Sequence, residues 1–202
     1  MSTTFKPNAT IDARGLSCPL PIVRARKAMD ALQVGEVLEV LATDRGAPAD
    51  FRGWCEQTEH KFLGVVEDEG FFRLYVKKLV PETKEKGPLF PREIRNEELA
   101  RRLEAGEAPI VLDVREPEEY EAGHIPGALS VPIESLVDFT DRLDRTAEIA
   151  VVCRSGRRSA YACRILEQAG FEKVVNVVPG MSAWSGPVER GRAEDAPSST
   201  AS

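Results

Sequence analysis

The sequence predicts two α/β domains: a two-layer βαβαββ sandwich over residues 1–80, and an open, mostly parallel sheet with helices on both faces over residues 92–190. Residues 81–91 between them carry three prolines, one glycine and four charges without an apolar period, which is typical of a linker. Charge also divides there. Residues 1–80 hold 11 basic and 11 acidic residues, whereas residues 81–202 hold 16 and 22, net −6.

In the first domain, apolar runs and turn residues predict each element in chain order. Val- and Leu-rich stretches indicate strands, and apolar residues at helical spacing indicate helices. The turn signal Asp68-Glu69-Gly70 predicts a hairpin between the last two strands. The predicted strands are 9–13, 36–43, 62–67 and 71–77, and the predicted helices are 19–32 and 48–60.

The second domain alternates strands and helices throughout. Its runs PIVLDV (109–114) and EIAVV (148–152) are almost continuously apolar, as expected for strands covered on both faces. In such sheets the functional site lies beyond the carboxyl ends of the strands. The predicted strands are 109–114, 128–131, 148–152 and 173–178, and the predicted helices are 96–105, 116–122, 134–143 and 158–169.

Composition excludes several classes of protein. A net charge of −6 and a pI near 5.2 argue against a nucleic-acid partner, and no apolar run reaches the ~20 residues of a membrane helix. The N-terminus lacks the apolar core of a secretory signal, so we expect a cytoplasmic protein with free thiols. The four cysteines form no CxxC pair, so neither a metal nor a cofactor is predicted. Residues 191–202 are predicted to be a disordered tail.

Cys18 is the first candidate for a reactive residue. It stands before a predicted helix that opens with Pro19, and Pro21 further stiffens the approach. A thiol at a helix N-terminus lies in the positive field of the helix dipole, which lowers its pKa. Arg14, Arg24, Arg26 and Lys27 add positive charge in the sequence. The alternative is a small buried core residue, which is the interpretation we give to Cys55.

Cys153 is the second candidate. It ends a buried strand and begins the segment Cys153-Arg154-Ser155-Gly156-Arg157-Arg158, which precedes a helix. Gly156 permits the backbone to wrap so that N–H groups point at one sulfur, and the three arginines add positive charge. We therefore expect the pKa of Cys153 to lie below the ~8.5 of a free thiol. The alternative is a surface arginine cluster after a core strand. Cys163 is interpreted as packed in the helix.

The N-terminal motif supports a family resemblance. Asp12-Ala-Arg-Gly-Leu-Ser-Cys18-Pro-Leu-Pro21 resembles the signature of the TusA/SirA family of small sulfur carriers, over about residues 9–79. The resemblance implies that Cys18 carries a persulfide and passes its sulfur to a partner. It also implies a supporting role for Asp44, which matches the family's aspartate at the end of the second strand.

The C-terminal half resembles a single-domain rhodanese over about residues 91–188. The resemblance rests on Leu112-Asp-Val-Arg-Glu-Pro-Glu-Glu-Tyr120, Gly123-His-Ile-Pro-Gly-Ala128 and the loop that begins at Cys153, in the family's order. It implies that Cys153 is the catalytic nucleophile, that residues 154–158 bind the substrate, and that Asp113 and Arg115 support the site. It also implies that His124 is structural rather than a base, and that Trp184 packs in a last helix.

Together these observations predict a sulfurtransferase. Cys153 takes sulfane sulfur from a small donor, thiosulfate or a thiol persulfide, and relays it through Cys18 to a protein or small-thiol acceptor. A connector of 12 residues (80–91) gives an effective concentration around mM. One alternative is a phosphatase of the rhodanese fold, although four residues rather than five separate Cys153 from Arg158, and Ser159 occupies the five-spacer position. The other is a redox-sensing or interaction module without catalysis.

Overall fold

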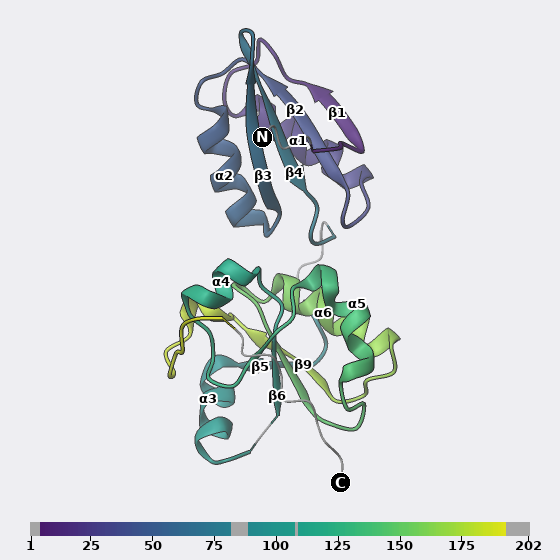
Figure 1. The fold of residues 1–202 in the computed structure, drawn as a ribbon, viewed down its shortest axis with the longest axis vertical. Coiled ribbons are helices and arrows are strands. Elements are labelled where there is room, and N and C mark those ends of the chain that lie inside the picture. The colour runs from purple at the N-terminus through teal and green to yellow at the C-terminus, as the bar shows by residue number, and fades with distance from the viewer. Residues whose placement is uncertain (1–4, 82–88, 108, 193–202) are drawn as a thin grey trace. The chain divides into compact units, whose positions relative to one another are not determined.

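The structure is a computed structural model, and it describes residues 5–81, 89–107 and 109–192 (Figure 1). The chain divides into two compact units, Met1–Lys84 and Glu85–Ser202. Most of the predicted linker (82–88) and most of the predicted tail (193–202) lie outside the described residues. In the part of the chain that is described, no helix has the length and apolar character needed to cross a membrane.

The first unit is the predicted two-layer βαβαββ sandwich. Its sheet has the order β1-β2-β4-β3, with β1 parallel to β2 and the other pairs antiparallel. Because β1 and β2 are parallel, the loops that follow them lie at the same end of the sheet. The elements are β1 (Ala9–Asp12), α1 (Leu20–Ala31), β2 (Val37–Ala42), α2 (Ala47–Thr58), β3 (Lys61–Asp68) and β4 (Phe71–Lys77).

Both helices of this unit pack on one face of the sheet. Ala25 and Met29 of α1 share a buried core with Phe51 and Cys55 of α2 and with alternate residues of β2 and β4. The core position predicted for Cys55 is confirmed. Helix α1 begins at Leu20, so Pro19 is its N-cap rather than its first helical residue.

The second unit is a five-stranded sheet of order β5-β9-β8-β6-β7, in which every pair is parallel. The predicted parallel sheet is confirmed. The strands are β5 (Glu93–Arg95), β6 (Ile110–Asp113), β7 (Leu129–Ser130), β8 (Ile149–Val152) and β9 (Val174–Val178), and the helices are α3 (Asn96–Glu104), α4 (Pro117–Ala122), α5 (Leu136–Phe139) and α6 (Arg157–Gln168).

Strand β8 lies in the middle of this sheet and is buried on both faces. Ile149 and Val151 join the core on one side, with residues of α5 and α6, whereas Ala150 and Val152 join the core on the other side, with residues of α3 and α4. This two-sided burial explains why the sequence of the strand is continuously apolar. Figure 1 shows the helices on the two faces of the sheet.

Two details of the second unit differ from the prediction. Strand β5 was not predicted, because three residues, two of them charged, give no apolar pattern. The helix predicted over 134–143 is wrong: it is a 3₁₀ turn (Ile133–Ser135), the single turn α5, and a second 3₁₀ turn (Thr140–Arg142). The Thr140 hydroxyl donates to the Val137 carbonyl at 2.8 Å, a local bond that competes with regular helix.

Lys78 is buried after β4 and provides a stability test. Its Nζ donates to the carbonyl oxygens of Met29 at 2.6 Å and Leu32 at 2.9 Å, at the end of α1. Lys78→Met keeps the side-chain length but removes both bonds, so we expect the unit to lose about 2 kcal/mol of unfolding free energy. Urea unfolding followed by Trp54 fluorescence in a Trp184→Phe background measures this loss, and Lys77→Met is the control. Equal midpoints for the two variants would contradict the expectation.

Candidate functional site

Cys153 lies where the carboxyl end of β8 turns toward α6, and its side chain is fully buried (0% exposed). The Gly156 N–H donates to Cys153 Sγ at 3.1 Å, and Ser159 Oγ lies 3.3 Å from the same sulfur. Gly156 has φ +91°, the left-handed conformation expected of it. The Gly156 N–H is a donor that favours the charged form of the sulfur. Because Cys153 Sγ is buried, a small-molecule substrate reaches it only when the surrounding side chains shift.

The hydroxyl at Cys153 belongs to a buried polar network that the sequence interpretation missed. Ser159 Oγ donates to Asn176 Oδ1 of β9 at 2.6 Å, and Asn176 Nδ2 donates to Gly156 O and Glu93 Oε1, both at 3.2 Å. These bonds fix the orientation of the Asn176 amide. Because the single Ser159 proton goes to Asn176, Ser159 Oγ is placed to accept the Cys153 S–H. A polar asparagine within the apolar run of 173–178 was the available signal.

A second set of hydrogen bonds joins the Cys153 loop to residues 180–182, which we call the brace. Met181 N–H donates to Cys153 O at 2.8 Å, and Ser182 N–H donates to Arg154 O at 2.9 Å. Gly180 precedes them with φ +83°, and a Cβ atom on it would lie 2.4 Å from Cys153 O. The buried Asn96 side chain bonds both the N–H and the carbonyl of Gly180. The carbonyls of Cys153 and Arg154 are therefore satisfied by this brace.

Arg158 is not a free cation of the loop. Its guanidinium is buried and binds Glu119 of α4 through two bonds, of 2.7 and 3.0 Å. Burial raises the pKa of Glu119, but the bonds and charge of Arg158 outweigh it, so the pKa stays below its ordinary value. The pair thus ties the start of α6 to α4. Arg154 and Ser155 are exposed, and Arg157 is half-buried.

Asp113 and Arg115 form a buried ion pair at the end of β6, beside β8. Arg115 Nη2 lies 2.6 Å from Asp113 Oδ2 and donates to Gly123 O at 2.7 Å. Each charge therefore has a partner close by. His124 stacks on Tyr120 with ring centroids 3.6 Å apart, and its Nδ1 lies 2.9 Å from Tyr120 O. This packing agrees with the structural role expected of His124.

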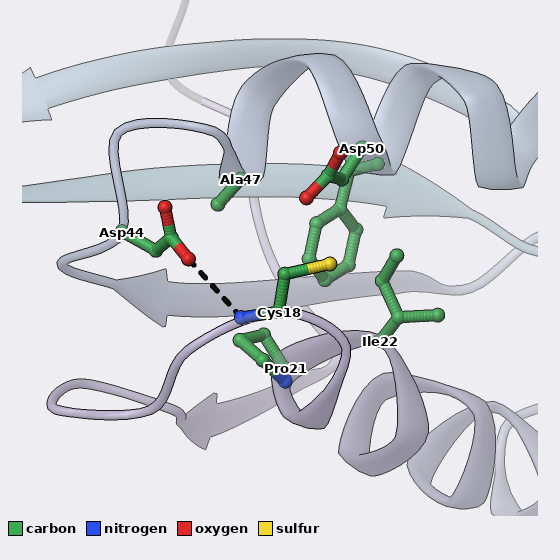
Figure 2. Close-up of a pocket in the computed structure, with 7 residues that line it drawn as sticks. Cys18, Pro21, Ile22, Asp44, Ala47 and Asp50 are labelled. Carbon is green, nitrogen blue, oxygen red and sulfur yellow. Dashed lines mark hydrogen bonds between the residues drawn. The ribbon is translucent and has the colours of Figure 1, made fainter.

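Cys18 lies in the first unit, in the loop between β1 and α1, and is exposed. Asp44 Oδ2 accepts the Cys18 N–H at 3.1 Å, and Asp44 Oδ1 accepts the Gly46 N–H at 2.9 Å, so this carboxylate joins the two loops. Figure 2 shows the sulfur in a shallow hollow between the two helices. The residues that line the hollow are Cys18, Pro21, Ile22, Asp44, Ala47, Asp50 and Phe51.

The lowered pKa predicted for Cys18 is wrong. A hydrogen bond to the Asp50 carboxylate, then burial, then the negative charges of Asp50 and Asp44 raise the pKa of this thiol. Of the cations expected to act on Cys18, Arg14 pairs with the Asp12 carboxylate and Arg24 donates to the Asp12 carbonyl. Cys18 is therefore a neutral thiol beside carboxylates.

The remaining cysteines are buried in the two cores. Burial raises the pKa of Cys55 to about 12 and raises the pKa of Cys163 even further, so both are unreactive thiols at neutral pH. The packed position expected of Cys163 is confirmed. Trp184 packs against the core as expected, but the element before it is only a 3₁₀ turn, Met181–Ala183. Among the residues described, no three His, Cys, Asp or Glu side chains gather as a metal site requires.

Each of the two candidate sites centres on one cysteine: a buried thiol that accepts a backbone N–H, and an exposed thiol beside carboxylates. Such an arrangement suits the class of proteins whose chemistry takes place on cysteine sulfur. Family comparisons support this class. Residues 9–78 match the family described as "Sulfurtransferase TusA", and residues 95–187 match the rhodanese-like domain.

Three relatives illustrate the similarity. "Putative sulfur carrier protein YrkF" of Bacillus subtilis is 41% identical over 185 residues, which cover 92% of this chain and 100% of YrkF. "Sulfur carrier protein TusA" of Allochromatium vinosum is 44% identical over 34% of this chain and 90% of its own length. A protein of the same organism named "Sulfurtransferase" is 36% identical over 46% of this chain and 87% of its own length. The chain belongs to the family in which a TusA sulfur-carrier domain is fused to a rhodanese-like domain.

Gly180 provides a test of the brace on the Cys153 loop. Gly180→Ala places a methyl group against Cys153 O and requires an unfavourable φ, so the loop must shift. We expect a loss of about 2 kcal/mol of stability in the second unit and slower reaction of Cys153 with thiosulfate. Gly127→Ala is the matched control, because it has φ +73° but open space around the added methyl group. If the two substitutions slowed the reaction of Cys153 with thiosulfate equally, the role of the close contact between Gly180 and Cys153 O would be contradicted.

Proposed function

We propose that this protein is a two-step sulfurtransferase. Cys153 takes sulfane sulfur from thiosulfate or a thiol persulfide and passes it to Cys18, which delivers it to an acceptor. The observation that best supports this function is the surroundings of Cys153 Sγ, which is buried and contacted by the Gly156 N–H and the Ser159 hydroxyl. Donors preorganised at a sulfur stabilise the negative charge that develops on it during transfer.

In the first step the Cys153 thiolate attacks the sulfane sulfur of thiosulfate. The bond between the two sulfur atoms of the donor breaks, its electron pair leaves with sulfite, and Cys153 becomes the persulfide anion Cys153–S–S⁻. This is covalent catalysis, and it splits the transfer into two simpler reactions. Charge and atoms balance without a further reactant.

The loop residues have distinct parts in this step. Arg154 and Ser155 form the exposed rim and Arg157 lies beside it, so these three meet the sulfonate of the donor. Gly156 bonds the sulfur through its N–H. Arg158 holds the loop in place through Glu119, and the pair of Asp113 and Arg115 supports the neighbouring strand end.

In the second step Cys18 attacks the outer sulfur of Cys153–S–S⁻. The new bond forms on Cys18, and the broken bond leaves its electron pair on Cys153 as a thiolate. The proton of Cys18 moves to the transferred sulfur, which gives Cys18–S–SH. The charges of the two sites support this encounter, because carboxylates line the Cys18 hollow whereas Arg154 and Arg157 belong to the Cys153 loop. Opposite charges favour the encounter of the two sites.

Thiocyanate formation from thiosulfate and cyanide tests the first step. Cys153→Ser removes the nucleophile, so we expect the rate to fall by about 10³-fold or more. Cys18→Ser keeps the first step and should retain most of the activity. Thiocyanate formation that survives Cys153→Ser would contradict the assignment. Hydrolysis of p-nitrophenyl phosphate by the wild type, lost in the same variant, would favour a phosphatase instead.

Mass spectrometry of digested protein tests the relay. After treatment with thiosulfate we expect sulfane sulfur on both Cys18 and Cys153 in the wild type. In Cys153→Ser the Cys18 peptide should gain none, since the carboxylates of Asp44 and Asp50 line its hollow and repel the thiosulfate dianion. Equal loading of Cys18 in the variant would show that the two units take sulfur independently.

A further inference from the structure

Asp50 is the one residue at the Cys18 hollow to which neither the fold nor the relay gives a role. It lies in the first turn of α2, and Figure 2 shows its carboxylate close to the Cys18 sulfur, across the hollow from Ile22. Cys18 and Asp50 both line the hollow, and the Asp50 carboxylate is the first cause of the raised pKa of the thiol. Asp44 differs, because its two oxygen atoms accept the backbone N–H groups of Cys18 and Gly46.

Transfer of sulfur to Cys18 requires a group that removes the proton of its thiol. A neutral thiol is a poor nucleophile, and the raised pKa leaves little thiolate at neutral pH. A base at the sulfur is therefore required during the attack. The lining contains two groups able to accept a proton besides the thiol itself, Asp44 and Asp50, and the other members are Pro21, Ile22, Ala47 and Phe51. Because Asp44 is committed to two N–H groups, Asp50 is the group placed to act.

We propose that Asp50 is a catalytic residue of the carrier unit, which takes the proton of Cys18 as its sulfur attacks an incoming persulfide and returns that proton to the transferred sulfur. This inference rests on the proposed function only in that Cys18 accepts sulfur. A persulfide arrives as an anion, R–S–S⁻, and its outer sulfur bonds to Cys18. The electron pair of the broken bond leaves with R–S⁻, and the proton passes through Asp50 to give Cys18–S–SH. Atoms and charge balance without another reactant.

The product of this step suits the same hollow. A hydropersulfide is neutral and donates a hydrogen bond, as the thiol does, so Asp50 receives the same kind of partner before and after transfer. An anionic persulfide would instead face the carboxylates of Asp44 and Asp50. The hollow thus holds carried sulfur in its protonated form.

Asp50→Asn in the full chain with Cys153→Ser tests the proposal through two readouts that move in opposite directions. Removal of the carboxylate removes a cause of the raised pKa of Cys18, so iodoacetamide should alkylate Cys18 severalfold faster at pH 8. Sulfur acceptance from glutathione persulfide should instead slow by about a hundredfold, the lower range for loss of a general base. Asp30→Asn, an exposed carboxylate in the last turn of α1, is the control for net charge.

The dependence of sulfur acceptance on pH gives a further signature. In the wild type the neutral thiol reacts with the help of Asp50, so the rate should be nearly flat between about pH 6 and 8. In Asp50→Asn the reaction needs free thiolate, and the rate should rise by about tenfold per pH unit. Asp50→Glu restores a carboxylate and should recover a flat profile if the asparagine variant is compromised in folding.

Each remaining outcome has a definite meaning. If acceptance accelerates together with alkylation in Asp50→Asn, the residue acts only as a negative charge and the proposal is overturned. Unchanged acceptance overturns it as well. If Cys18 takes sulfur from glutathione persulfide but never from Cys153 in the otherwise wild-type chain, the relay fails while the role of Asp50 stands.

Discussion

The hydrogen bond from the Gly156 N–H to the buried sulfur of Cys153 is the contact on which the loop of the second unit depends. The sulfur lies at the end of the central strand β8, where the N–H of Gly156 and the hydroxyl of Ser159 reach it. The carbonyls of Cys153 and Arg154 accept the N–H groups of Met181 and Ser182. The close approach of the two segments then requires glycine at position 180.

The two cysteines hold sulfur in opposite surroundings. Cys153 Sγ accepts the Gly156 N–H, which favours a sulfur anion, whereas carboxylates line the hollow of Cys18, which favours a protonated sulfur. This difference suits the distinct tasks of the proposed function. In that proposal one unit takes sulfur from an anionic donor by nucleophilic attack. The other keeps it in a neutral form that is a weaker nucleophile but a better electrophile for delivery to an acceptor thiolate.

Local features of the sequence predicted much of this arrangement. The segment from Cys153 to Arg158 shows a strand end, a glycine and a helix start within six residues, so the loop and the conformation of Gly156 were accessible from sequence. The two-sided burial of β8 was equally plain from its apolar run. By contrast, the pKa predicted for Cys18 from its neighbours in the sequence was wrong. Arg14 and Arg24 bond to Asp12, whereas the carboxylates of Asp44 and Asp50 raise the pKa of the thiol.

The contacts that could not be predicted from the sequence join residues that are far apart in the chain. Ser159 and Asn176 are 17 residues apart, and Asn96 and Gly180 are 84 apart. Such pairs depend on which side chains of a strand or helix face the site. A shift of one residue in a strand would turn every side chain to the opposite face of the sheet. Arg158 shows the same limit, because its partner Glu119 comes from another helix.

The charge state of carried sulfur is the claim on which this account depends, and it is directly measurable. Cys18→Ser, loaded with thiosulfate, carries a persulfide on Cys153, and Cys153→Ser, loaded with glutathione persulfide, carries one on Cys18. Titration of the ultraviolet absorption of the persulfide anion gives the ionisation midpoint of each. The account predicts that the persulfide on Cys153 ionises at a clearly lower pH than the persulfide on Cys18. Equal midpoints, or the reverse order, would contradict it.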